Sequence, residues 1–143
     1  MRRFFSLLLV VSAATALLGC GGKVARPATI PQPGVDARLA HEVFFGSQSS
    51  APATIEVSVT NRAAVPIKLR RVELDSPGMG QWGILRRTEY FNDTIGPGET
   101  RTRAIVVTAV TTTRRPSEPL QIRAIFELES GGAYWREMLF ARQ

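Results

Sequence analysis

Apolar and polar residues alternate with a period of two through much of the chain after residue 38. In the segment TIEVSVT, residues 54–60, the three aliphatic side chains fall on one face and the glutamate and serine fall on the other. Successive side chains of an extended strand point to opposite faces of its sheet, so this pattern predicts a half-buried β-strand.

The segment QIRAIFELE, residues 121–129, repeats the pattern and leads into the clearest hairpin of the sequence. Ile122, Ala124, Phe126 and Leu128 share one face. The small residues SGGA, 130–133, then supply a turn, and YWREMLF, 134–140, follows as a second strand. Two alternating runs joined by a glycine-rich turn are typical of an antiparallel β-hairpin.

Four further strands are predicted, at residues 39–45, 67–74, within 82–91 and at 102–111. In the second of these the alternation skips one step at Arg70 and Arg71. A β-bulge at this point would restore a single buried face. About seven short strands with regular turn signals and no helical periodicity predict an all-β fold, an antiparallel sandwich.

The segment TIGPGET, residues 94–100, resembles the turn that precedes a strand in bacterial immunoglobulin-like and fibronectin-type modules. The resemblance concerns the fold alone, and the chain has no Cys–Trp–Cys arrangement of the antibody type. It implies that residues 38–143 form an immunoglobulin-like β-sandwich.

The N-terminus has the three zones of a secretory signal peptide: Arg2 and Arg3, an apolar stretch from Phe4 to Leu18, and small residues. Fifteen helical residues would span about 22 Å, whereas the hydrocarbon core of a bilayer is about 30 Å thick. The stretch is therefore short for a transmembrane helix. The two arginines also suggest a twin-arginine signal, but the rest of that pattern is missing and general secretion is the better interpretation.

The signal ends in Leu17-Leu18-Gly19-Cys20, which resembles the lipobox of bacterial lipoproteins. The resemblance implies cleavage of residues 1–19, a diacylglycerol on the sulfur of Cys20 and a further acyl chain, such as palmitate, on the new N-terminus. More than one chain gives stable membrane anchoring. Gly21 after the cysteine implies the outer membrane, facing the periplasm, in an organism with two membranes. Cleavage after the A-x-A pattern of Ala14 and Ala16 is the alternative, and it would release a soluble protein with a free cysteine.

Residues 20–37 contain glycines and several prolines with little periodicity, and we expect them to form a flexible tether. Because this tether would join the first strand near Leu39, we expect the Leu39 end of the sandwich to face the membrane. The loop at residues 75–83 should emerge at that same end.

Charge and cysteine content narrow the function. The chain has a formal net charge of +6, but residues 39–143 contain 13 basic and 11 acidic side chains, which leaves +2. This balance argues against a nucleic-acid partner, which requires a concentrated basic face. Cys20 is the only cysteine, so the sandwich has no disulfide and must be stabilised by burial.

Candidate catalytic groups are few. His41 would lie on the apolar face of the strand predicted at 39–45, and a catalytic role would pair it with Ser47, Ser49 or Ser50. No G-x-S-x-G motif supports that role, so a structural histidine is favoured. Glu127 and Glu129 alternate outward as in a solvated strand face, and no clustered ligands predict a metal site or cofactor.

Three arginine pairs, at 70–71, 86–87 and 114–115, indicate either an anionic partner or protection of sheet edges, with the second favoured. The loop at residues 75–83 carries Met79 and Trp82, which are candidates for binding a partner. The structural alternative, favoured for Trp82, is that it closes one end of the core. Trp135 is expected to be packed.

Together these features predict a lipid-anchored cell-envelope protein with a non-catalytic interaction or structural module, and an envelope protein or glycan as its partner. The alternative is an accessory module that binds glycan or another anionic envelope ligand. An enzyme is the third choice.

Overall fold

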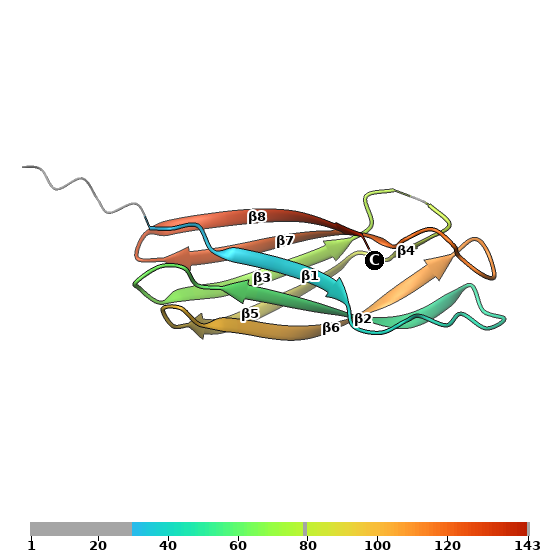
Figure 1. Cartoon of the computed structure of the whole chain (residues 1–143), viewed down its shortest axis with the longest axis horizontal. Coiled ribbons are helices and arrows are strands. Elements are labelled where there is room, and N and C mark those ends of the chain that lie inside the picture. Colours follow the sequence, from blue (N-terminus) through green and yellow to red (C-terminus); the bar gives the residue numbers. More distant parts are fainter. Residues whose placement is uncertain (1–29, 79, 143) are drawn as a thin grey trace, which may run out of the picture.

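The computed structural model describes residues 30–78 and 80–142, which form eight β-strands in two packed antiparallel sheets (Figure 1). The first sheet has the order β1-β2-β6-β4 and contains β1 (Gly34–Leu39), β2 (Ser50–Thr60), β6 (Thr100–Thr111) and β4 (Trp82–Ile84). The second has the order β5-β3-β7-β8 and contains β5 (Arg87–Ile95), β3 (Ile67–Asp75), β7 (Gln121–Ser130) and β8 (Ala133–Arg142). The predicted all-β fold, an antiparallel sandwich, is confirmed, with one strand more than expected.

The alternating residues build the core between the two sheets. From β2 the aliphatic residues Ile55, Val57 and Val59 point inward, and from β7 the inward face includes Phe126 and Leu128. All five side chains are almost completely buried. Their burial supplies the main stabilisation in a domain that has no disulfide.

The predicted bulge lies in β3, where the pairing register with both neighbouring strands shifts between Leu69 and Arg71. Its effect is visible in the ion pairs of the two arginines. Arg70 pairs with Glu129 and Arg71 pairs with Glu127. These glutamates are two residues apart on β7 and share its outer face, so the bulge turns two consecutive arginines to one side of the sheet.

The predicted hairpin joins β7 to β8 through Gly131 and Gly132. Their φ angles are 48° and 92°, in the left-handed region that favours glycine. Two such residues in a two-residue loop match the right-handed twist of the flanking strands.

The first strand lies earlier in the chain than predicted. β1 begins at Gly34, inside the segment expected to be a tether, and ends at Leu39, where the predicted strand was to begin. After Leu39 the amide of Ala40 still donates to the carbonyl of Thr54 (2.8 Å), and the chain then leaves the sheet. His41 is consequently exposed in a loop, so its expected place on the apolar face of a strand is wrong.

The uncertain strand within residues 82–91 is in fact two strands in different sheets. β4 pairs with β6 through only three residues, and β5 pairs with β3. Because β4 is so short, most of β6 has no partner strand on that side. Here Arg103 of β6 donates to Asp93 of β5 (Nε to Oδ2, 2.7 Å), which joins the two sheets at their open side.

The two ends of the sandwich differ in what they carry (Figure 1). The chain enters at Gly34, at the end that also has the turns at residues 61–66, 96–99 and 130–133. The opposite end carries the loops at residues 40–49, 76–81 and 112–120. The expectation that the Leu39 end adjoins the tether is therefore wrong, because the chain reaches the sandwich one strand length earlier. No helix in residues 30–78 and 80–142 combines the length and apolar character of a membrane span.

Candidate functional site

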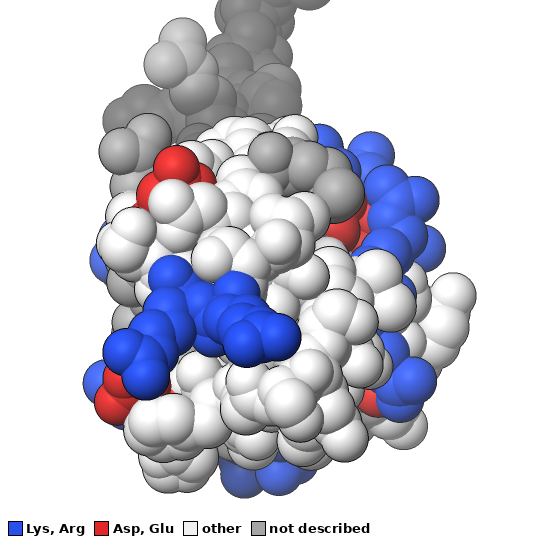
Figure 2. All heavy atoms as spheres, turned by 90° about the vertical axis from the view of Figure 1, so that its right-hand side faces the viewer, with Lys and Arg blue, Asp and Glu red and all other residues white. Residues whose placement is uncertain are grey.

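A groove of about 700 Å³ lies at the end of the sandwich opposite to Gly34. We call it the distal groove. It is bordered by the end of β1, the loop after β1, the start of β4 and the loop after β6. Its lining consists of Leu39, Glu42, Val43, Phe44, Phe45, Gly46, Trp82, Arg114, Arg115 and Pro116. Figure 2 views this end and shows a largely uncharged surface with a group of neighbouring basic side chains.

The loop after β1 forms one wall of the distal groove and is held at two points. The amide of Gln48 donates to the carbonyl of Phe45 (2.9 Å), and the amide of Thr111 donates to the carbonyl of Ser49 (2.9 Å). Phe45 is only 6% exposed, whereas Phe44 is 78% exposed. One phenylalanine therefore anchors the loop in the core, and its neighbour is displayed to solvent.

Trp82 joins this wall to the opposite one. Its ring meets that of Phe45 edge to face, with centroids 5.8 Å apart, and its indole Nε1–H donates to the carbonyl of Glu118 (2.8 Å). The residue is partly buried against the core and also borders the groove. Its position fits the core-closing role, and its part in binding a partner stays a prediction. Met79, the other candidate of this loop, lies outside the described residues.

The loop after β6 forms the second wall and carries the arginine pair Arg114 and Arg115. Gln81 fixes this loop: its backbone carbonyl accepts from the amide of Thr112 (2.9 Å), and its side-chain oxygen accepts from the amide of Ser117 (2.7 Å). These hydrogen bonds hold the backbone on both sides of the arginines. The backbone of the arginine pair is thereby fixed beside the groove that the two residues line.

Arg114 and Arg115 are exposed, and within the described part of the chain neither has a carboxylate within ion-pair distance. Most other arginines of that part are paired: Arg38, Arg70, Arg71, Arg86, Arg87, Arg103 and Arg123. Glu42 lies in the same groove and offsets one of the two positive charges. The lining therefore combines an apolar surface with a net excess of one positive charge.

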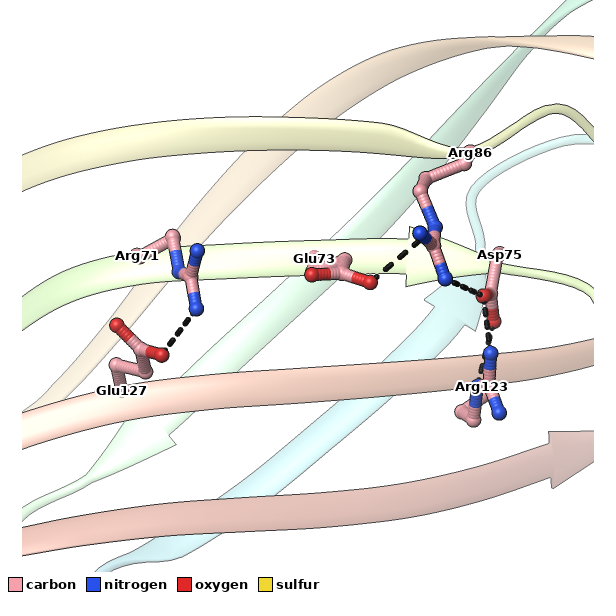
Figure 3. A network of polar contacts seen from close by, with 6 residues as sticks. All are labelled: Arg71, Glu73, Asp75, Arg86, Arg123 and Glu127. Atoms are coloured by element: carbon pink, nitrogen blue, oxygen red, sulfur yellow. Dashed lines mark hydrogen bonds and ion pairs between the residues drawn. The ribbon is translucent and has the colours of Figure 1, made fainter.

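Arg71 and Arg86, one from each of the other two arginine pairs, form ion pairs on the outer face of the second sheet (Figure 3). Asp75 lies between Arg123, whose Nε donates to Oδ1 (2.7 Å), and Arg86, whose Nη2 lies 3.4 Å from Oδ2. Arg86 also approaches Glu73 at 3.3 Å. Hydrogen bonds from Arg123, with a contribution from Arg86, hold the pKa of Asp75 below its ordinary value although burial opposes the shift.

This network changes the interpretation of both the arginines and the glutamates on this face. Glu127 and Glu129 do point outward as expected, and they bind Arg71 and Arg70 across the strands. The arginines at 70–71 and 86 thus connect neighbouring strands, a role that neither sequence interpretation included. The pair at 114–115 is the one that remains directed at a groove.

The groups considered for catalysis are not brought together. His41 is exposed in the loop after β1, and Ser47, Ser49 and Ser50 are exposed further along the same stretch. The hydrogen bonds of the described residues include none between His41 and these hydroxyls. Within residues 30–78 and 80–142, no three His, Cys, Asp or Glu side chains cluster as a metal site requires.

A second exposed surface lies on β8, at the edge of the second sheet. Tyr134, Met138 and Phe140 are exposed on its outer face. Residues at every second position of a strand share one face, which places these three side chains together. Phe44 and the distal groove were not anticipated, although the consecutive phenylalanines at 44–45 were a usable signal: in an extended chain, one of two neighbours must face away from the core.

Comparison with known proteins adds similarity at the level of overall shape only. No protein-family model matches the chain, and no curated protein matches its sequence. It is similar to a protein from Archaeoglobus fulgidus, with 15% identity over 77% of this chain and 92% of that chain and a TM-score of 0.46. It is also similar to a FixG-related protein from Vibrio parahaemolyticus, with 13% identity over 79% of this chain and 95% of that chain and a TM-score of 0.39. Similarities this distant carry no functional assignment.

Proposed function

We propose that this chain is a lipid-anchored protein of a bacterial cell envelope whose β-sandwich is a non-catalytic interaction module. The observation that carries the proposal is the arrangement of the two ends of the sandwich: the chain enters at the Gly34 end of β1 (Figure 1), and the residues that line the distal groove lie at the other end. A domain held at one end presents the opposite end to its surroundings. In an organism with two membranes, the anchor would lie in the outer membrane and face the periplasm.

The N-terminal sequence supports the anchor. Cys20 follows Leu17, Leu18 and Gly19 at the end of an apolar run, and Gly34 comes fourteen residues later. Fourteen residues span at most about 50 Å when fully extended. The intervening segment would therefore let the sandwich stand clear of the membrane while it remained attached.

The lining of the distal groove supports binding more than catalysis. It consists mainly of apolar side chains, with two arginines and Glu42 as its charged groups. General acid–base or nucleophilic catalysis needs a base within hydrogen-bond reach of the group it acts on. Glu42 is the one carboxylate of the lining, and no histidine, serine, cysteine or lysine lines the groove beside it as a partner for such catalysis.

The alternative function, an accessory module for glycan or another anionic ligand, is favoured by one observation. Arg114 and Arg115 have no ion-pair partner among the described residues, and they line the same groove as the exposed ring of Phe44. Anionic groups bind arginine well, and sugar rings stack on aromatic faces. Trp82, however, already packs against Phe45, so Phe44 is the one aromatic ring of the lining that is largely exposed.

Two measurements on the full chain in its native cells test the proposal. Metabolic labelling with a fatty acid should mark the wild-type protein and not Cys20→Ser, which should also leave the membrane fraction. A photo-crosslinking residue at Phe44 should capture a specific protein, whereas the same residue at Val65, an exposed apolar position at the entry end, should not. Labelling that persists in Cys20→Ser would contradict the anchor. Equal capture from both positions would contradict presentation of the distal end.

A further inference from the structure

We infer that the distal groove binds a protein segment in which an acidic side chain lies next to a bulky apolar one. This inference rests on the proposed function as an interaction module and specifies the chemistry of the partner.

The size and walls of the groove fit one or two large side chains. A volume of about 700 Å³ lies within the range of well-formed ligand sites. Leu39, Val43, Phe44 and Pro116 supply apolar wall from both bordering loops. Phe44, at 78% exposed, would lose most of its contact with water against an apolar side chain of the partner. That loss is the main source of affinity that the groove offers.

The positive charges of Arg114 and Arg115 favour a carboxylate on the bound segment. Arginine can hold a carboxylate through two parallel hydrogen bonds, as Arg103 does with Asp93 and Arg123 does with Asp75. Arg114 and Arg115 have no such partner in the described residues, although their neighbours along the groove include Glu42. An acidic residue of a binding segment would satisfy one guanidinium or both.

The same charges disfavour a polyanion. Glu42 reduces the positive excess of the lining to one charge, and residues 39–143 together carry only +2. An acidic polysaccharide or a layer of anionic lipid presents many negative charges and is bound by broad basic surfaces. A single carboxylate beside an apolar side chain matches the lining more closely.

The groove is also ordered before a partner arrives. Phe45 and Trp82 fix the first wall, and Gln81 fixes the backbone on both sides of Arg114 and Arg115. Binding therefore has to order the arginine side chains and Phe44 but little backbone. Smaller ordering costs leave more of the contact energy as affinity.

The test uses the protein purified from membranes in a nonionic detergent and an array of uncharged hexapeptides into which residue pairs are placed. Each pair places Asp or Glu next to a bulky apolar residue. For every such peptide, a matched peptide carries Asn in place of Asp or Gln in place of Glu. We expect binding of acidic-apolar pairs, with affinity at least about tenfold weaker for the matched amides, as measured by anisotropy with an uncharged fluorophore. Exchanging both Arg114 and Arg115 for Gln should weaken the best peptide by a similar factor.

The matched control is Arg62→Gln with Arg101→Gln, which removes two exposed positive charges from the entry end and should leave peptide affinity unchanged. Equal binding of acids and amides, equal loss in both double variants, or binding of anionic lipid vesicles but of no peptide would overturn the inference. The Cys20→Ser protein should bind peptide like the wild type. Evidence against the lipid anchor can therefore be told apart from evidence against peptide binding in the groove.

Discussion

Asp75 and Arg123 face each other across β3 and β7, and the carboxylate accepts hydrogen bonds from both Nε and Nη2 of the guanidinium. Asp75 is the only buried charged residue among the described residues, and Arg86 approaches it from the side opposite Arg123 (Figure 3). A single carboxylate thus connects β3, β7 and the segment that leads into β5.

Replacing Asp75 by Asn should therefore lower the free energy of unfolding by about 1–3 kcal/mol, because two arginines lose the charge of a shared acceptor. Urea denaturation followed by circular dichroism measures the effect. Asp36→Asn is the control, since Asp36 is exposed and forms no ion pair within the described residues. A loss for Asp75→Asn no larger than that of the control would contradict the bridging role.

Stability should fall in acid. Hydrogen bonds from Arg123 hold the pKa of Asp75 below its ordinary 3.8, and hydrogen bonds from Arg103 hold the pKa of Asp93 below the same value. The unfolded state then takes up protons at a higher pH than the folded state, so stability from these groups is complete above about pH 5 and is lost as the pH falls through about 4 and below. Thermal unfolding at a series of pH values checks this. The double variant Asp75→Asn with Asp93→Asn should lose less stability as the pH falls. If its stability falls as steeply as that of the wild type, these two carboxylates are not the cause of the acid sensitivity.

The hairpin between β7 and β8 should depend on its glycines. At a φ of 92°, Gly132 adopts a conformation that an alanine side chain opposes, and Gly132→Ala should cost about 1–2 kcal/mol of unfolding free energy. Gly78→Ala is a matched control, because nothing lies within 4 Å of the added methyl group and φ lies outside the left-handed region. If Gly132→Ala and Gly78→Ala change the free energy of unfolding in urea equally, a side chain at position 132 does not strain the turn.

The neighbouring residues Phe44 and Phe45 should have different roles, Phe44 in binding and Phe45 in stability. Phe45→Ala removes a buried ring that meets Trp82 and should destabilise the domain by about 3–5 kcal/mol. Phe44→Ala should change stability by less than about 0.5 kcal/mol, because the ring is exposed, yet it should weaken capture of the partner. Paired measurements of unfolding and of affinity for the best peptide of the array decide the matter. A stable Phe45→Ala, or an unstable Phe44→Ala, would reverse the assigned roles.

The sequence was informative where structure depends on neighbouring residues. Alternation in β2 and β7 identified the core face, the skipped step at Arg70 and Arg71 identified the bulge, and two glycines identified the hairpin. Each of these signals is local, because a strand's buried face and a turn's φ angles are set within a few residues.

β1 was misplaced because two overlapping segments alternate equally well. Residues 34–39 and 39–45 both carry apolar residues at every second position, and the first contains Gly34 and Ala37, which are weak strand formers. The choice between them depends on pairing with β2, where Leu39 lies opposite Ile55. That register is a contact between distant parts of the chain and leaves no trace in either segment alone.

The distal groove was missed for a related reason. Its walls come from residues 39–46 and 114–116, which are joined by Trp82 and Gln81. Neither loop has a motif, and the unpaired state of Arg114 and Arg115 depends on which carboxylates the other arginines occupy. The sequence could identify the arginine pairs as equivalent candidates but could not rank them.

The separation of chain entry from the distal groove also bears on how strong a contact must be. With the proposed lipid anchor at Cys20, copies attached through the same segment would hold their grooves within one thin layer beside the membrane, so a partner fixed in that layer would meet them at a high effective concentration. The partner and the groove then find each other by diffusion in two dimensions and not in three. A groove of modest intrinsic affinity would then be occupied in the envelope while its binding to the same segment in dilute solution stayed weak.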